Sequence, residues 1–126
     1  MGQAITRDVA LVVEDDHDVR DLAAAILEET DLKVVEADSA EEALHYLREN
    51  AAKVALLFTD IRLPCLMDGI DLARTAHLKW PWIRVIVTSG AAVDRTSDLP
   101  RGAKYLQKPW SALDVLIEAE RAASHH

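Results

Sequence analysis

The stretch that decides the fold is residues 54–60, which read Val-Ala-Leu-Leu-Phe-Thr-Asp. Its first six residues, 54–59 (VALLFT), are the most apolar strand candidate in the chain, and an acid, Asp60, follows them. A short, continuous apolar run is typical of a strand that is buried on both faces of a parallel sheet. We therefore expect this strand at the centre of a sheet, with Asp60 at its carboxyl end.

Four more strands are predicted, two before this one in the sequence and two after it. Residues 9–13 (VALVV) form another apolar run that ends in acids, whereas residues 33–36 (KVVE) are more polar and favour the edge of the sheet. The remaining runs are residues 85–87 (VIV) and residues 105–107 (YLQ).

Helical patterns alternate with these strands. Apolar side chains recur at three and four over residues 19–29, which predicts an amphipathic helix with Leu22 inward and Arg20 outward. Asp16 is a candidate cap for it. Ser39 and Glu42 form a capping-box pattern that opens a second helix, over residues 39–50.

Two further helices are predicted, one from about residue 69 to Pro81 and one from Ser111 to about residue 122. Residues 90–102 are polar and contain Pro100, so any helix there should be short. Strands that alternate with helices predict an α/β sandwich with a parallel sheet.

The length of 126 residues suits one domain, and we place its core at about residues 8–122. With 14 basic and 22 acidic residues the net charge is −8, which argues against direct binding to nucleic acid or to an anionic membrane. Cys65 is the single cysteine, so no internal disulfide forms, and the chain is predicted to be cytoplasmic. His125 and His126 match the stub of a purification tag and enter no metal argument.

Polar residues follow the predicted strands at the points where they end. Ligands of open α/β sheets bind outside the carboxyl ends of the strands, so these residues should meet there. Three carboxylates held close together require a hard cation or a proton, and a set of oxygen ligands favours Mg²⁺ or Mn²⁺. An ammonium and a hydroxyl beside them suit a transferring phosphoryl group. The residues concerned are Glu14, Asp15, Asp60, Thr88 and Lys108.

The segments LVVEDD, FTDIRLP, VIVTSG and YLQKP occur in this order, and together they resemble the receiver domain of two-component response regulators. The resemblance covers residues 9–122 and implies a flavodoxin-like, doubly wound fold. It implies a five-stranded parallel sheet in the order 2-1-3-4-5 with about five helices, the fourth short or irregular.

The resemblance also implies the roles of the site residues. Asp60 matches the phosphoacceptor and a metal ligand, and Asp15 matches the principal acidic Mg²⁺ ligand. Glu14 matches an acid that acts on the metal through water, and Arg62 matches the residue that offers its backbone carbonyl.

Three more positions match residues that respond to the phosphoryl group. Lys108 matches the ammonium that pairs with it, Thr88 the hydroxyl that moves toward it, and Tyr105 the aromatic switch. A cis peptide is implied between Lys108 and Pro109. From the residues alone, the alternative for Tyr105 is a static core tyrosine with its hydroxyl at the surface.

The function implied is a stand-alone receiver that takes a phosphoryl group from a histidine kinase or a histidine phosphotransfer protein and switches a protein-interaction surface. It is a signalling domain that promotes its own phosphorylation and dephosphorylation, and its downstream partner stays unnamed. One alternative is a receiver-like module that binds partners without phosphorylation, and another is a receiver domain of a longer regulator or hybrid kinase. A small phosphatase is disfavoured, because Arg62 stands two residues past Asp60, where a general acid would be needed.

Overall fold

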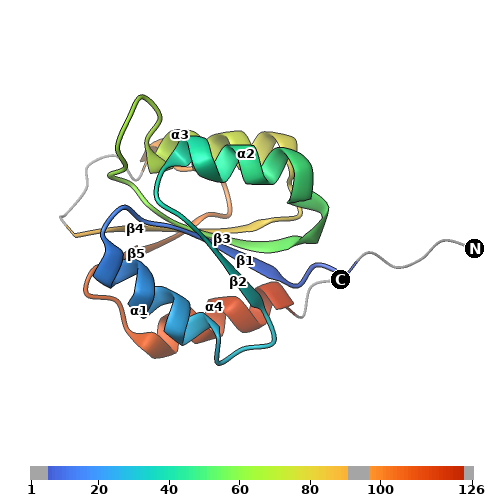
Figure 1. The fold of residues 1–126 in the computed structure, drawn as a ribbon, viewed down its shortest axis with the longest axis vertical. Coiled ribbons are helices and arrows are strands. Elements are labelled where there is room, and N and C mark those ends of the chain that lie inside the picture. The colour runs from blue at the N-terminus through green and yellow to red at the C-terminus, as the bar shows by residue number, and fades with distance from the viewer. Residues whose placement is uncertain (1–5, 91–96, 124–126) are drawn as a thin grey trace, which may run out of the picture.

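The computed structural model describes residues 6–90 and 97–123. Its centre is a sheet of five parallel strands in the order β2-β1-β3-β4-β5, which confirms the expected order (Figure 1). The more polar strand, β2, lies at an edge as predicted. The strands are β1 (Val9–Val13), β2 (Lys33–Ala37), β3 (Val54–Asp60), β4 (Arg84–Ser89) and β5 (Lys104–Gln107).

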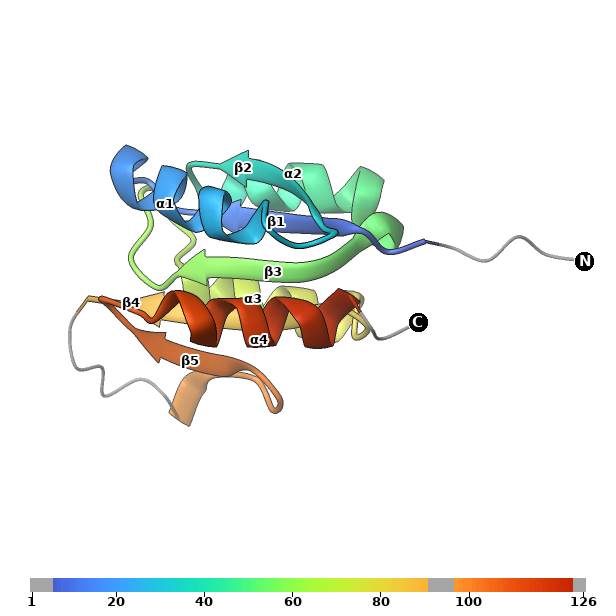
Figure 2. The ribbon, with the colours of Figure 1, turned by 90° about the horizontal axis from the view of Figure 1, so that it is seen from below.

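Helices cover both faces of the sheet. Helices α2 (Ala40–Asn50) and α3 (Gly69–Lys79) lie on one face, and α1 (His17–Leu27) and α4 (Ala112–Ala123) lie on the other (Figures 1 and 2). The flavodoxin-like, doubly wound sandwich expected above is therefore confirmed. No helix of the described residues has the length and apolar character needed to cross a bilayer.

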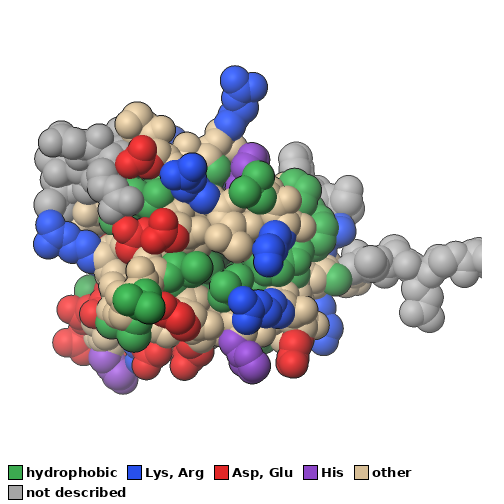
Figure 3. Space-filling view, turned by 90° about the horizontal axis from the view of Figure 1, so that it is seen from above, with side chains coloured by type: hydrophobic (Ala, Val, Ile, Leu, Met, Phe, Trp, Pro, Cys, Tyr) green, Lys and Arg blue, Asp and Glu red, His purple; other side chains and the backbone are tan. Residues whose placement is uncertain are grey.

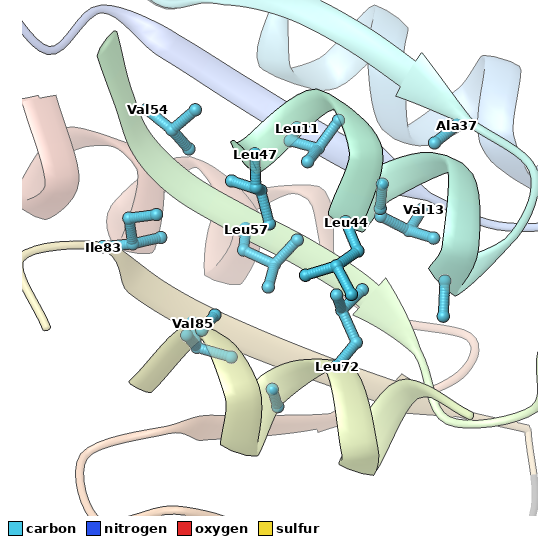
Figure 4. Close-up of a cluster of buried hydrophobic side chains, with 14 of the residues drawn as sticks. Leu11, Val13, Ala37, Leu44, Leu47, Val54, Leu57, Leu72, Ile83 and Val85 are labelled. Atoms are coloured by element: carbon cyan, nitrogen blue, oxygen red, sulfur yellow. The ribbon is translucent and has the colours of Figure 1, made fainter. Parts of the chain in front are cut away.

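The core follows from the apolar strands. Every residue of β1 and β3 is buried, because both strands are covered on two faces. On one face, Leu44 and Leu47 of α2 reach toward Leu57 of β3, and Leu72 of α3 joins them (Figure 4). We call this side the α2–α3 core. Burying a leucine side chain of this kind stabilises the fold by about 2 kcal/mol.

Side-chain caps fix where the helices begin. Asp16 accepts hydrogen bonds from the backbone N–H groups of Asp18 and Val19, and Ser39 accepts one from Glu42. The predicted capping box at α2 is only half formed, because the Glu42 carboxylate accepts from Asp38 N–H instead of Ser39 N–H. A reciprocal capping box is present at α3, between Asp68 and Asp71.

The predicted helix within residues 90–102 differs from the other four. Residues 91–96 of this segment lie outside the described residues. Of the described residues that follow, 97–98 form a short 3₁₀ turn before Pro100, so the described part of the chain contains four α-helices. Proline has no N–H to donate and cannot continue a helix, which agrees with the short element expected there.

Two orientations predicted for α1 are wrong. Leu22, expected to face inward, is 55% exposed, whereas the Arg20 side chain, expected to face outward, is only 18% exposed. The guanidinium of Arg20 turns toward the sheet, where it donates to the backbone oxygen of Glu14 at 2.9 Å and to Glu36 at 3.3 Å. Long-range polar partners thus override the apolar periodicity that the sequence shows.

Candidate functional site

The topology brings the polar strand ends to one edge of the sheet. Glu14 and Asp15 follow β1, and Asp60 ends the neighbouring strand β3. In the ladder to β4, Asp60 is paired with Thr88, whose backbone oxygen accepts a hydrogen bond from Ile61 at 2.8 Å. Five residues far apart in sequence, Lys108 included, can therefore act on one ligand.

Three carboxylates meet at this edge, and we call them the carboxylate cluster: Glu14, Asp15 and Asp60. One oxygen of each lies within 4.8 Å of those of the other two. Glu14 and Asp60 are buried, whereas Asp15 is exposed. Figure 3 shows that acidic side chains gather on the side of the molecule where the strands end, at the left of the view. An oxygen-only cluster of this kind has the chemistry of a Mg²⁺ or Mn²⁺ site.

Lys108 bridges the two buried carboxylates. Its Nζ lies 2.9 Å from Glu14 Oε2 and 3.2 Å from Asp60 Oδ2. The lysine side chain is 20% exposed, and the Glu14 and Asp60 side chains are 5% and 8% exposed. Because little water reaches this site, its charges are weakly screened and each strongly affects the others.

The pKa values reflect this coupling. Burial raises the pKa of Glu14; the hydrogen bond from Lys108 works against that rise, and the charge of Asp60 adds to it. Burial by itself would lower the pKa of Lys108, but the hydrogen bond to Glu14 and the negative charge of Asp60 raise it overall. Because its pKa is raised, Lys108 stays protonated and positively charged between Glu14 and Asp60.

Thr88 provides a hydroxyl without a partner. The residue is fully buried, and its Oγ1 has no hydrogen-bond partner among the described residues. A buried hydroxyl in this condition forgoes a hydrogen bond that would contribute about 1 kcal/mol. It is thus a donor ready for an acceptor oxygen, beside the strand position of Asp60.

The remaining predicted residues lie close to this edge in the fold. Tyr105 is half-buried on β5, opposite Val87 of β4, and packs against the α2–α3 core. Arg62 is exposed and follows Ile61. The role of its backbone carbonyl stays a prediction. The peptide bond between Lys108 and Pro109 is cis, as the resemblance implied.

Beside the carboxylate cluster, Trp110 borders an apolar hollow of about 360 Å³. Its ring stacks edge-on against Phe58 of β3, with 5.5 Å between ring centres, and the exposed Leu22 of α1 lies across the hollow. Leu22, expected to face the core, therefore lines an exposed apolar surface next to the carboxylate cluster.

Sequence reasoning missed the part that Gly69 plays. A Cβ on this residue would lie 1.8 Å from the backbone oxygen of Asp60, so the first residue of α3 passes against the backbone of the central acid. Gly69 N–H also donates to Ile61 O at 2.8 Å. A glycine that follows the loop after Asp60 is the signal that could have revealed this close approach.

Comparison with known proteins agrees with this geometry. The model of the response regulator receiver domain family matches residues 10–120. The chain is 37% identical to the response regulator receiver protein CpdR of Brucella abortus, over 88% of this chain and 92% of that protein. It is 30% identical to a putative NtrX-like response regulator of Rickettsia bellii, over 89% of this chain but only 24% of that longer protein.

A solved structure supports the same assignment. The crystal structure of the receiver domain of NtrX from Brucella abortus is 32% identical and superposes with a TM-score of 0.80, covering 93% of this chain and 99% of that one. Since the family model spans most of the sequence and the sheet order agrees with it, this chain belongs to the response regulator receiver domain family.

Proposed function

We propose that Asp60 accepts a phosphoryl group from a histidine kinase or a histidine phosphotransfer protein, in a reaction that depends on Mg²⁺. The observation that carries this proposal is the buried Asp60 carboxylate, bonded to Lys108 within the carboxylate cluster. Phosphorylation then switches a surface that binds a downstream protein partner. We infer a single receiver domain over residues 1–126, with its core at about residues 8–122, and a cytoplasmic location.

The metal proposal rests on the donor set. Asp15 and Asp60 would bind Mg²⁺, or Mn²⁺, directly, Glu14 through water, and Arg62 through its backbone carbonyl. These are the oxygen donors that hard divalent ions prefer, and the three carboxylates lie close enough to share one ion. The bound ion would offset negative charge on the phosphoryl oxygens.

The residues of the chain divide the chemistry among them. An Asp60 oxygen attacks phosphorus and an acyl phosphate bond forms, while the bond between phosphorus and the donor's histidine nitrogen breaks. The electron pair of that bond stays on the ring nitrogen, and because the other ring nitrogen of the phosphohistidine already carries a proton, the donor leaves as neutral imidazole. Lys108, which now holds Asp60 Oδ2, can pair with a phosphoryl oxygen because its ammonium lies on a flexible stem. The Thr88 hydroxyl donates to another phosphoryl oxygen, and this satisfies its unused donor.

The switch would follow from those new bonds. A Thr88 hydroxyl drawn toward the phosphoryl group vacates space near β5, where Tyr105 packs half-buried against the α2–α3 core. Two arrangements of Thr88 and Tyr105 would then exchange, and phosphorylation favours one of them.

The test is incubation with Mg²⁺ and acetyl phosphate, followed by intact-mass measurement. The wild type should gain the mass of one phosphoryl group, and Asp60→Asn should gain none. Asp114→Asn, an exposed change on α4, is the matched control and should be phosphorylated like the wild type. Equal phosphorylation of Asp60→Asn would refute the assignment, and a wild type that binds its partner without taking up phosphate would favour the phosphorylation-independent module.

A further inference from the structure

The loop between β3 and α3, residues 62–68, leaves the site directly after Asp60 and Ile61. Its base is closed by the hydrogen bond from Gly69 N–H to Ile61 O at 2.8 Å. Its outer part has little support: Leu66 is fully exposed, and Cys65 takes a left-handed backbone conformation with φ of 75°. The position of the outer loop therefore depends on contacts other than the hydrogen bond at its base.

One long-range hydrogen bond does this. Met67 N–H donates to Glu41 Oε2 at 3.1 Å, and the two residues are 26 positions apart in sequence. Within the described part of the chain, it is the one hydrogen bond that the backbone of residues 62–67 makes. A carboxylate acceptor strengthens the bond, because it carries a full negative charge.

Glu41 belongs to helix α2, which is capped and packed against the core. It lies in the first turn of α2, where Ser39 caps the helix, and its neighbour Ala40 is fully buried in the α2–α3 core. The Met67 side chain is half-buried against the same core. The loop is thus pinned at Met67 twice, by apolar packing and by the Glu41 carboxylate.

We propose that Glu41 is a positioning residue that holds residues 62–67 in place beside Asp60, and so sets how well the Arg62 carbonyl is placed for Mg²⁺. This rests on the proposed function, in which that carbonyl is a ligand. Loss of the Glu41 bond leaves the apolar packing of Leu63 and Met67 to hold the loop beyond its base, and it leaves the carboxylate cluster intact. Ion binding would then have to order the loop, and the free-energy cost of that ordering weakens the affinity for Mg²⁺.

The experiment compares Glu41→Ala, Glu41→Gln and Glu49→Ala. Glutamine keeps a carbonyl acceptor for Met67 N–H but removes the charge, and Glu49 is an exposed acid in the last turn of the same helix. Two quantities are measured on the unphosphorylated protein: the amide hydrogen exchange rate of Met67, and the Kd for Mg²⁺ by calorimetry.

In Glu41→Ala, Met67 exchange should become about threefold to tenfold faster and Mg²⁺ binding should weaken by a similar factor, the size expected when one hydrogen bond is lost. Glu41→Gln should recover most of both, and Glu49→Ala should match the wild type. The proposal is overturned if Glu41→Ala exchanges like the wild type. It is also overturned if Glu41→Gln binds Mg²⁺ as weakly as Glu41→Ala, since charge alone would then explain the loss.

These outcomes are separable from failure of the proposed function. Hydrogen exchange at Met67 requires neither Mg²⁺ nor a phosphodonor, so it reports the bond to Glu41 directly. A wild type that takes no phosphoryl group would refute the role of Asp60 and leave the exchange result standing.

Discussion

Gly69 shows how closely one residue can be constrained by the backbone of another. The Cβ that any other residue would carry there meets Asp60 O at 1.8 Å, Asp60 C at 2.7 Å and the Ile61 Cα at 2.9 Å. All three are backbone atoms, which cannot move aside as the end of a flexible side chain can. The position of Asp60 thus depends on the absence of a side chain at the start of α3.

Gly69→Ala should therefore lower the free energy of unfolding by about 3 kcal/mol, since an overpacked site forces the backbone to shift. It should also slow phosphorylation of Asp60, because the shifted peptide carries that carboxylate. The matched control is Gly90→Ala, because a Cβ there would meet, among the described residues, only Lys108 Cδ at 4.0 Å. This variant should change stability by less than about 0.5 kcal/mol. Urea unfolding of both variants measures the difference, and equal midpoints would contradict it.

At the scale of single residues, the sequence predicts position better than partner. Glu14, Asp60 and Lys108 could be placed because each follows an apolar run, and the carboxyl ends of parallel strands share one edge. Arg20 could not, because its partners are the backbone oxygen of Glu14, which follows β1, and the side chain of Glu36 in β2, and the helix pattern reveals neither. The close approach of Gly69 is likewise set by tertiary packing.

At the scale of elements, a buried carboxylate ties α4 to the sheet. The Glu118 side chain is 4% exposed, and its Oε1 accepts from both Nη2 and Nε of Arg84, at 2.7 and 2.9 Å. Its Oε2 accepts from Arg121 at 3.1 Å, but the Arg121 side chain is 60% exposed. The two arginines therefore contribute unequally.

Arg84→Met should destabilise the fold by about 2 kcal/mol, because it leaves a buried carboxylate without its closest partner. Arg121→Met, the matched control, should cost less than about 1 kcal/mol, as expected for an exposed ion pair. Thermal unfolding of the two variants gives the comparison. Equal destabilisation would mean that Glu118 does not depend on Arg84 in particular.

The strands were the elements best predicted. Residues 9–13 match β1 in full, and each of the other four strands is longer than predicted. β1 and β3 are buried on both faces, and such strands read as unbroken apolar runs. The link from α4 to β4 through Glu118 has no such signal, since an acid in a helix reads as an exposed residue. The pattern of apolar residues predicts the helices and strands, whereas the partners of polar side chains are known only from the folded structure.

At the scale of the whole molecule, stability should respond to magnesium. An ion that binds the folded protein and not the unfolded chain stabilises the fold by about 1.4 kcal/mol at ten times its Kd, which raises the Tm by about 5 °C for a domain of this size. The carboxylate cluster brings its charges together only when folded. Melting with MgCl₂, against NaCl of equal ionic strength, should show this rise in the wild type and little of it in Asp15→Asn. A rise of equal size in both proteins would place the ion elsewhere.

The order of the strands has a consequence for how copies of this protein meet. The sheet ends in β2 on one side and β5 on the other, and open edges of this kind can recruit a strand from another chain. Exposed Lys33 and Glu36 lie along β2, and exposed Lys104 and Gln107 lie along the four-residue β5. Charged, short edges are unfavourable templates for β-pairing. The molecule is thereby protected from growing sheets across neighbours, and contacts between proteins are left to its helices and loops.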